Sequence, residues 1–311
     1  MVKRALVAAA AASFLGGCDQ FTSLKGTPVA PLASQPIVIM HRGGGQGNPD
    51  YRENTLPAIV YGAGVYDGAE MDLQLSQGGT LWLGHDNDVH DCSDPAGGPT
   101  GGAVVDCFQN LGDAEIETYA YCDTATAAPC TDRLASTCEQ HYVRLEDVFE
   151  RFSTDPTLLQ KLLSLDVKDQ LCGRTGGIPE SQTMANALHG LVTKYQMDWR
   201  LLVQSDQRTF VSQFHDNGTQ TFLFIEGYGD VDPIIEDAAK QGATGISYPY
   251  RNAPLDPTFA PGLRQVGLHV MVWTVPDPRD AVADIPLVWA MSPDVIETDR
   301  PDFFLYVPRL P

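Results

Sequence analysis

The feature that most constrains the fold of this chain is the alternation of short apolar, β-rich runs with segments of helical pattern. Strand-like runs begin at residues 36, 68, 162, 201, 221, 245, 269 and 294. Helical patterns lie between them, at 55–63, 144–152, 181–196, 207–216 and 232–241. This order predicts parallel strands connected by helices. Eight such strands indicate an α/β fold of the (β/α)8 barrel type, with a doubly wound open sheet as the alternative.

The second run, 68–75, is followed by Gly78, Gly79 and a further run over 81–85. The link is too short for a parallel crossover, so we expect a hairpin with the two glycines at its turn. In that register residue 77 pairs with 80, and Asp72 lies opposite His85. Glu70 and Asp72 alternate with apolar residues, so both carboxylates share the face of His85. A shift of one residue would remove this cluster.

Residues 87–140 differ in kind from the rest of the chain. They are rich in glycine, proline and cysteine, with little periodicity, and we interpret them as a Cys-rich, disulfide-stapled insertion or long loop after the hairpin. Beyond the leader, the cysteines are Cys92, Cys107, Cys122, Cys130, Cys138 and Cys172. An even number outside the cytoplasm indicates up to three disulfides, but six cysteines allow fifteen pairings and the sequence selects none.

The N-terminal residues carry a targeting pattern. Lys3 and Arg4 precede an apolar stretch, and Leu15-Gly16-Gly17-Cys18 follows. This resembles the bacterial lipobox, which implies cleavage after residue 17 and acylation of Cys18; an ordinary signal peptide is the alternative. Residues 18–35 then form a flexible tether, and 36–311 form the barrel domain. We expect an extracytoplasmic protein that is lipid-anchored to a bacterial membrane through Cys18. The sequence does not select between the inner and the outer membrane.

The charge of the chain limits its partners. The formal net charge is −20, and clustered basic residues, with which phosphate-backbone recognition begins, are missing from the sequence. We therefore expect no nucleic-acid partner, and no obligatory protein partner is indicated. Most of the acidic residues belong to a solvated surface, so acids that bind a metal are a small subset.

Polar residues follow several of the expected strands. In a (β/α)8 barrel the C-terminal ends of the strands meet at one face, where active sites lie. The residues expected there are His41, Glu70, Asp72, Asp166, Lys168, Glu226 and Trp273. Carboxylates are ligands for Ca²⁺ or Mg²⁺, and a cation would relieve the repulsion between acids on one strand face. An exposed strand face is the alternative interpretation.

The other groups suit chemistry on a phosphodiester. His41 and His85 could act as general base and general acid, because imidazole titrates near neutral pH. Arg42 and Lys168 could contact the phosphate as cations. One divalent metal ion, two cations and two histidines together predict a phosphoryl-transfer site.

The motifs that carry these residues resemble those of the glycerophosphodiester phosphodiesterases. They are His41-Arg42-Gly43, Glu53–Leu56, Glu70-x-Asp72, His85-Asp86, Asp166-x-Lys168, Val272–Val275 and Ile296–Pro301. The resemblance spans residues 36–305 and implies a TIM barrel that hydrolyses glycerophosphodiesters to glycerol 3-phosphate and an alcohol.

The resemblance also implies a role for each residue. His41 and His85 would form the acid–base pair, and Arg42 would contact the phosphate. Glu70, Asp72 and Asp166 would bind the metal, Glu53 would orient neighbouring groups, and Trp273 would pack against the substrate.

Two departures from the family pattern leave the substrate open. Asp166 stands where the family usually has glutamate, and residues 87–92 replace the usual pattern after His85-Asp86. An Asp-x-Lys motif with an early disulfide loop also resembles the related phospholipase D toxins, which act on sphingomyelin or lysophospholipids. A catalytically silent, lipid-anchored binding protein is the alternative from another class.

Overall fold

In the described part of the chain, eight parallel strands close into a barrel. The computed structural model describes residues 30–44, 51–91, 103–119, 141–167, 178–214, 218–224, 231–250, 257–275 and 282–307. The barrel strands are β1 (Ile37–Met40), β2 (Gly68–Leu75), β6 (Leu162–Val167), β7 (Leu201–Ser205), β8 (Gln220–Phe224), β9 (Gly245–Pro249), β10 (His269–Trp273) and β11 (Val295–Thr298). β1 pairs with both β11 and β2, which closes the sheet. The predicted (β/α)8 barrel is confirmed, and the open-sheet alternative is wrong.

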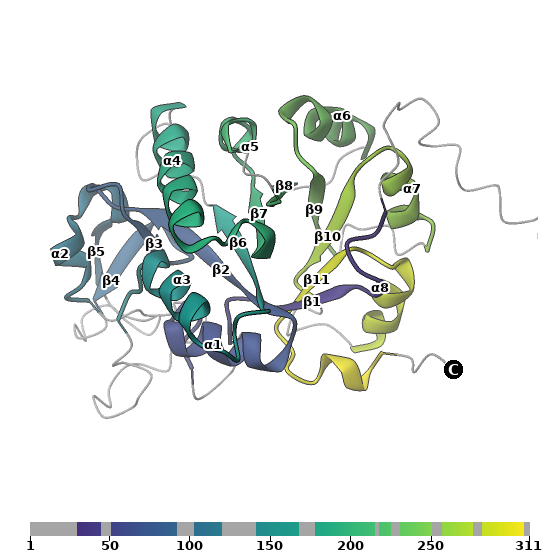
Figure 1. Cartoon of the computed structure of the whole chain (residues 1–311), viewed down its shortest axis with the longest axis horizontal. Helices are drawn as coiled ribbons and strands as arrows, with labels where there is room; N and C mark the ends of the chain where they lie inside the picture. Colours follow the sequence, from purple (N-terminus) through teal and green to yellow (C-terminus); the bar gives the residue numbers. More distant parts are fainter. Residues whose placement is uncertain are drawn as a thin grey trace, which may run out of the picture.

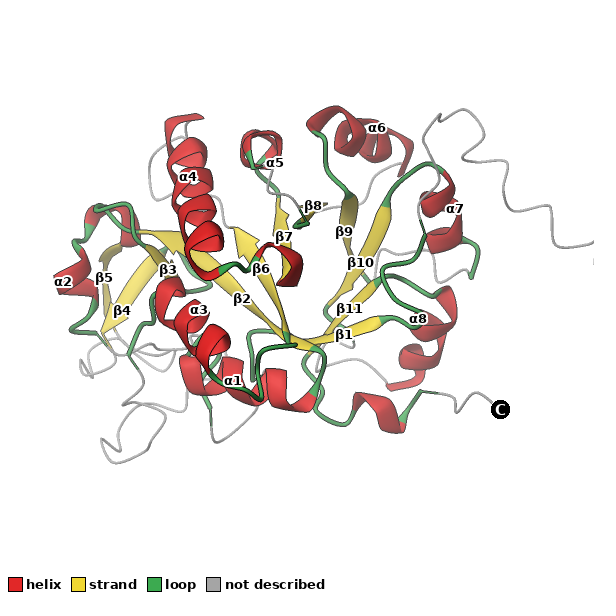
Figure 2. Cartoon of the chain, in the orientation of Figure 1, coloured by secondary structure: helices red, strands yellow, loops and turns green. Residues whose placement is uncertain are grey.

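Helices surround this barrel (Figures 1 and 2). The α-helices beside the strands are α1 (Leu56–Val65), α3 (Leu145–Thr154), α4 (Ile178–Tyr195), α5 (Arg208–Gln213), α6 (Val231–Gln241), α7 (Phe259–Gln265) and α8 (Ile285–Met291). Short 3-10 turns are Asp198–Arg200, Val282–Asp284 and Phe303–Leu305. The sequence did not predict α7 and α8, because both are short and contain Pro261 or Pro286, residues that normally interrupt a helical pattern.

The hairpin that follows β2 forms, but its predicted register is wrong. β3 (Leu81–Leu83) pairs antiparallel with β2 so that Leu73 lies opposite Leu83. The turn has three residues rather than two: the Ser76 backbone N–H donates to Thr80, and Gly79 has φ +83°. A glycine in this conformation is typical of three-residue hairpin loops. Asp72 therefore lies opposite Gly84, whose N–H donates to the Asp72 carbonyl, and not opposite His85.

The barrel interior is apolar at one end and polar at the other. Five side chains fill the end where the strands begin: Ile39, Leu202, Phe222, Met271 and Val295. At Gly245 an added Cβ would lie 2.6 Å from the Phe222 ring, so the ring needs a glycine beside it. Further along the strands, inward-facing positions carry Glu70, Asp72, Ser164, Asp166, Gln204, Ser247 and Glu297, all buried. Because these five apolar side chains close the N-terminal end of the barrel, the polar groups face its C-terminal end.

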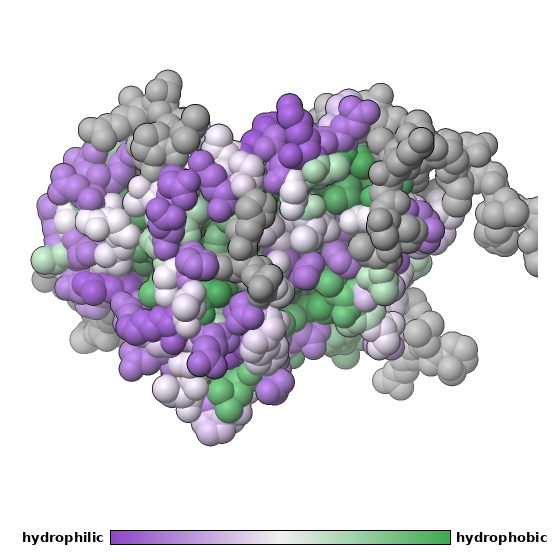
Figure 3. Space-filling model, turned by 45° about the horizontal axis from the view of Figure 1, so that its top comes forward, coloured by the Kyte–Doolittle hydropathy of each residue, from purple (hydrophilic) through white to green (hydrophobic). Residues whose placement is uncertain are grey.

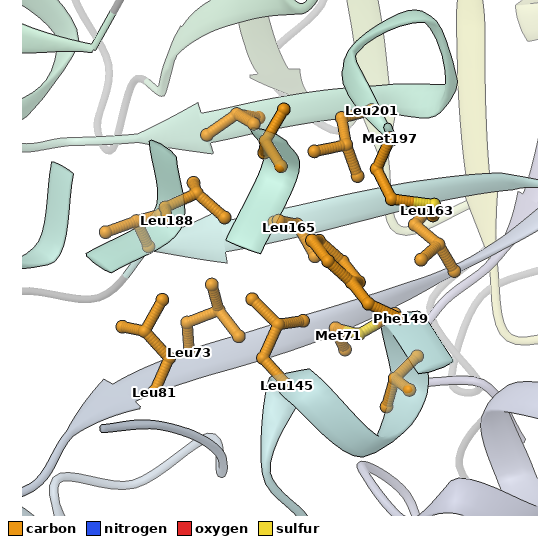
Figure 4. Close-up of a cluster of buried hydrophobic side chains, with 14 of the residues drawn as sticks. Met71, Leu73, Leu81, Leu145, Phe149, Leu163, Leu165, Leu188, Met197 and Leu201 are labelled. Atoms are coloured by element: carbon orange, nitrogen blue, oxygen red, sulfur yellow. The ribbon is translucent and has the colours of Figure 1, made fainter. Parts of the chain in front are cut away.

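The outer surface of the strands packs against the helices. Met71, Leu73, Leu163 and Leu165 alternate with the inward-facing residues of β2 and β6 and contact Phe149 of α3 and its neighbours (Figure 4). Strands that are covered on both faces must bury their outward-facing residues as well as the inner ones. Packing on both faces therefore fixes which side chains of β2 point into the barrel.

Part of the predicted insertion has regular structure of its own. β4 (Asp88–Asp91) and β5 (Ala103–Cys107) form a separate two-stranded sheet, followed by a 3-10 turn (Phe108–Asn110) and α2 (Asp113–Ile116). Trp82, Val89, Phe108 and Tyr142 join this sheet to the barrel through a small apolar cluster. Of the two interpretations of 87–140, this part is an insertion with its own small sheet and not a plain loop.

The disulfide framework of the insertion stays a prediction. Cys107 is disulfide-bonded, but the other five cysteines beyond residue 18 lie outside the described residues. Residues 1–29, with the predicted signal peptide and Cys18, lie outside them too. Within the described ranges, none of the helices combines the length and the apolar character that a membrane span requires. Hydrophilic residues cover much of the visible face of the molecule (Figure 3).

Substituting Phe149 tests the packing of α3 on the barrel. The side chain is fully buried, so Phe149→Ala should lower the free energy of unfolding by about 3–5 kcal/mol through lost contacts and a cavity. Urea denaturation followed by fluorescence measures the change. Leu159→Ala, at a residue that is 40% exposed, is the control and should cost less than about 1 kcal/mol. Equal losses for the two variants would contradict this packing.

Candidate active site

The turn after β1 presents two of the predicted site residues. The Gly43 N–H donates to Met40, and the Gly44 and Asn54 N–H groups donate to the Arg42 carbonyl. Arg42 has φ +49°, a conformation that is uncommon for a residue with a side chain. Gly43 lies against α1, where a Cβ would lie 2.5 Å from the Ile59 nitrogen. The glycine thus allows the tight turn that directs His41 and Arg42 toward the mouth of the barrel.

His41 is held by an acid from the opposite end of the sequence. Its Nδ1 lies 2.8 Å from Asp299 Oδ1, just after β11, and its Nε2 lies 3.9 Å from Glu70 Oε2. Burial acts to lower the pKa of His41, but the Asp299 carboxylate outweighs that effect and raises it above its ordinary value. Asp299 therefore fixes the ring with Nε2 directed toward the acids and stabilises its protonated form.

Arg42 and Asn54 bind the acids from the side of the first loop. The Arg42 backbone N–H donates to Glu70 Oε2, and its Nη1 donates to Glu53 Oε1 at 2.7 Å. Its Nε lies 3.3 Å from Asp72 Oδ2. The Asn54 amide donates to Asp72 Oδ2, while its oxygen accepts the Asp72 backbone N–H. Glu53 thus lies beside Arg42, and both ends of the Asn54 amide bind Asp72.

Three buried acids come together at the ends of β2 and β6. Asp72 pairs with Asp166 in the parallel register, and Glu70, Asp72 and Asp166 each offer an oxygen within 4.8 Å of the others. Burial raises the pKa of Glu70 well above its ordinary value, and the charges of Asp72, Glu297 and Asp166 add to that shift. A divalent cation would neutralise this repulsion, so the oxygen donors fit Ca²⁺ or Mg²⁺.

A fourth acid, Glu297, lies inside the barrel and was not among the predicted site residues. It accepts hydrogen bonds from Ser164 at 2.7 Å and from the Gln204 amide at 3.2 Å. Burial raises the pKa of Glu297 to about 7, although these bonds and the charge of His41 act in the opposite direction. The residue stood inside a quoted motif, as did Asp299. Chain order alone could not show that either side chain faces the residues of β1 and β2.

His85 is tied to β2 by a different contact from the predicted cross-strand pair with Asp72. It follows Gly84, and the Gln74 side-chain amide of β2 donates to the carbonyls of both residues, at 3.2 and 3.3 Å. Its Nδ1 lies 2.9 Å from Asp86 Oδ1. The His85 side chain is 38% exposed, in contrast to His41. His85 is thus placed by the inward-facing residues of β2 even though the register shifts by one residue.

The far side of the barrel mouth carries an aromatic pair. Trp273, at the end of β10, stacks on Phe224, at the end of β8, with ring centroids 4.8 Å apart. Lys168 and Glu226 lie outside the described residues, so their placement stays a prediction. Among the described residues, the structure brings His41, Arg42, Glu53, Glu70, Asp72 and Asp166 into one contiguous network.

The barrel and this constellation define a class of protein. A set of acids that could bind a cation, together with an arginine and histidines at the C-terminal end of a (β/α)8 barrel, suits hydrolysis of a phosphoric ester. The model of the glycerophosphoryl diester phosphodiesterase family matches residues 41–303. The chain therefore belongs to that family, and it is a phosphoric diester hydrolase.

Solved structures share the fold. A glycerophosphodiester phosphodiesterase from Parabacteroides distasonis is 18% identical, with a TM-score of 0.64 over 89% of this chain and 95% of that one. One from Thermotoga maritima is 20% identical, with a TM-score of 0.59 over 88% and 98%. An Oleispira antarctica phosphodiesterase in complex with sn-glycerol-3-phosphate is 15% identical, with a TM-score of 0.63 over 88% and 96%. No curated protein matched the chain.

The pairing of His41 with Asp299 predicts a measurable titration. In metal-free protein, Asp299→Asn should lower the pKa of His41, because burial and the Arg42 charge then act without an opposing carboxylate. NMR titration of the imidazole signals measures the shift. The raised pKa of His41 stabilises the folded protein at pH values below the pKa of histidine in the unfolded chain. This stabilisation is lost as the pH rises through the pKa of His41 in the folded protein. The variant should therefore lose stability mainly on the acidic side. An unchanged His41 titration would contradict the assignment.

The acid trio predicts opposite effects of one substitution with and without metal. Without metal, Asp166→Asn should leave the melting temperature unchanged or raise it, because it relieves repulsion between buried acids. Millimolar Ca²⁺ or Mg²⁺ should raise the melting temperature of the original protein but have much less effect on the variant. Glu236→Gln, which removes an exposed acid on α6, is the control and should keep the full metal effect. An equal metal effect in Asp166→Asn would contradict a cation site here.

Proposed function

We propose that this protein hydrolyses glycerophosphodiesters to glycerol 3-phosphate and an alcohol, with His41 and His85 as the acid–base pair and one divalent cation bound by Glu70, Asp72 and Asp166. The observation that carries the proposal is the meeting of the acid trio with His41 and Arg42 at the C-terminal end of the barrel. Family membership supports the reaction class, and the structural neighbour that holds sn-glycerol-3-phosphate supports the product.

The acid trio would hold the metal, and Ca²⁺ and Mg²⁺ both remain candidates. When bound, the cation would place positive charge beside the phosphate oxygens and so stabilise the negative charge that develops on them in the transition state. Asp166 is one methylene shorter than the glutamate usual in the family. This difference gives the trio a distinct shape, and metal preference is therefore a property to measure.

The chain's own residues orient the substrate and move protons. Arg42 carries a guanidinium beside Asp72, where it would contact a phosphate oxygen, and Lys168 is proposed as a second cation. One imidazole takes the proton of the attacking oxygen, and the other donates a proton to the oxygen of the departing alcohol. Asp299 and Asp86 hold the Nδ1 atoms of His41 and His85, so each ring presents Nε2 for this exchange. The Trp273–Phe224 pair would pack against the carbon skeleton of the substrate.

We also propose that the enzyme acts outside the cytoplasm, anchored through a lipidated Cys18. The support is the lipobox-like sequence that ends at Cys18. A small-molecule phosphodiester is then the substrate, and the membrane is a partner only through the anchor. Mass spectrometry of the membrane fraction would detect acylated Cys18, and its absence there would count against the anchor.

Activity of purified residues 19–311 tests the reaction. Release of glycerol 3-phosphate from glycerophosphocholine should require Ca²⁺ or Mg²⁺ and cease with EDTA. His41→Ala and His85→Ala should each lower kcat by about 100-fold or more. His189→Ala, at an exposed position of α4, is the matched control and should retain turnover.

The outcomes separate the competing functions. If folded protein releases nothing from glycerophosphocholine but cleaves lysophosphatidylcholine, the phospholipase-D-like alternative holds. If it cleaves neither substrate with any metal, the result favours the hypothesis of a catalytically silent binding protein. Wild-type turnover in both histidine variants would overturn the assigned acid–base pair.

A further inference from the structure

The carboxylate that holds His85 has a second histidine on its other side. Asp86 Oδ1 lies 2.9 Å from His85 Nδ1, and Asp86 Oδ2 lies 4.0 Å from His90 Nε2. The Asp86 side chain is 42% exposed, so its contact with His85 competes with water. A histidine beside the other oxygen of this carboxylate would further restrict the rotation of the carboxylate, and His90 lies there.

The position of His90 is set by the small sheet beside the barrel. His90 lies in β4, and the pairing of β4 with β5 shifts register between Val89 and His90. Such bulges redirect side chains and are frequent next to active sites. Val89 is fully buried in the apolar cluster with Phe108 and Tyr142. His90, although adjacent in sequence, is directed to Asp86.

Tyr142 fixes the backbone of His90. The His90 N–H donates to the Tyr142 hydroxyl at 3.0 Å, and the Tyr142 ring packs edge-on against Phe108 with centroids 5.2 Å apart. Tyr142 is only 5% exposed. Burial raises the pKa of Tyr142, and the nearby negative charges of Asp86 and Asp88 add to that effect. The tyrosine therefore stays neutral, and its hydroxyl serves as a fixed acceptor for the His90 backbone N–H.

The His90 ring is not explained by packing alone. The residue is 9% exposed, and among the described residues its buried Nδ1 has no hydrogen-bond partner. Buried polar atoms without a partner are rare and call for an explanation. An ordinary apolar residue would fill the position without this penalty. The other ring nitrogen, Nε2, faces the Asp86 carboxylate, and that carboxylate contacts His85, a proposed catalytic residue.

We propose that His90 is a positioning residue that acts through Asp86 on His85. Its Nε2–H restrains one oxygen of Asp86, the other oxygen holds His85 Nδ1, and His85 Nε2 is thereby directed to the substrate. At 4.0 Å the His90–Asp86 contact is longer than a hydrogen bond, and hydrogen bonds in active sites are often long before substrate binds and shorten in the complex. The inference rests on the proposed function, because it assigns His90 to the reaction in which His85 takes part.

Two substitutions at position 90 separate positioning from simple packing. In His90→Gln the side-chain amide nitrogen stands close to the place of Nε2, whereas in His90→Asn it stands near Nδ1 and cannot reach Asp86. We expect His90→Asn to lower kcat for glycerophosphocholine by about tenfold with KM within about twofold, since misplacement of a catalytic group acts on the chemical step. His90→Gln should recover most of the loss. His141→Asn, at an exposed histidine in the same region, is the matched control and should change neither constant.

A double-mutant cycle shows whether the effect passes through Asp86. In an Asp86→Ala background, His90→Asn should cost little more, because the side chain that links His90 to His85 is already removed. Three results would overturn the inference: wild-type kcat in His90→Asn, an equal loss in His90→Gln and His90→Asn, or the same loss with and without Asp86. Failure of the proposed function is a different result, namely absence of turnover in the unsubstituted protein with metal present.

Discussion

The pairing of β1 with both β11 and β2 is the constraint on which the rest of the structure depends. It closes the sheet, so residues separated by more than 250 positions become neighbours at one end of the barrel. His41, at the end of β1, meets Asp299 from the end of β11 on one side and Glu70 from β2 on the other. Without closure these groups would lie at opposite edges of an open sheet, and the acid trio would lack its histidine.

Three of the buried acids in the barrel are stabilised by hydrogen-bond donors arranged around them. Asp72 takes hydrogen bonds from Asn54, Glu70 takes the Arg42 backbone N–H, and Glu297 takes Ser164 and Gln204. Charges buried without such donors would be strongly destabilising. Burial, with the repulsion between neighbouring acids, raises the pKa of Glu70 and Glu297. A cation bound by Glu70, Asp72 and Asp166 would relieve this repulsion.

Several features of the site were predictable from local patterns. Period-two alternation placed Glu70 and Asp72 on one face of β2, and the motifs located His41, Arg42 and Asp166 at strand ends. The pairing of Asp72 with Gly84 rather than His85 was not predictable, because a three-residue turn with Gly79 at positive φ changes the register by one residue.

The sequence by itself determined the order of the eight barrel strands, the family, and the identity of the acids and histidines, since these follow from residue type and short-range spacing. The tertiary structure decided which groups touch. Asp299 on His41, Glu297 between Ser164 and Gln204, and His90 beside Asp86 all depend on strand pairing and side-chain direction across long separations. The physical reason is that local pattern fixes the face of a strand, whereas only barrel closure and packing fix what lies opposite that face.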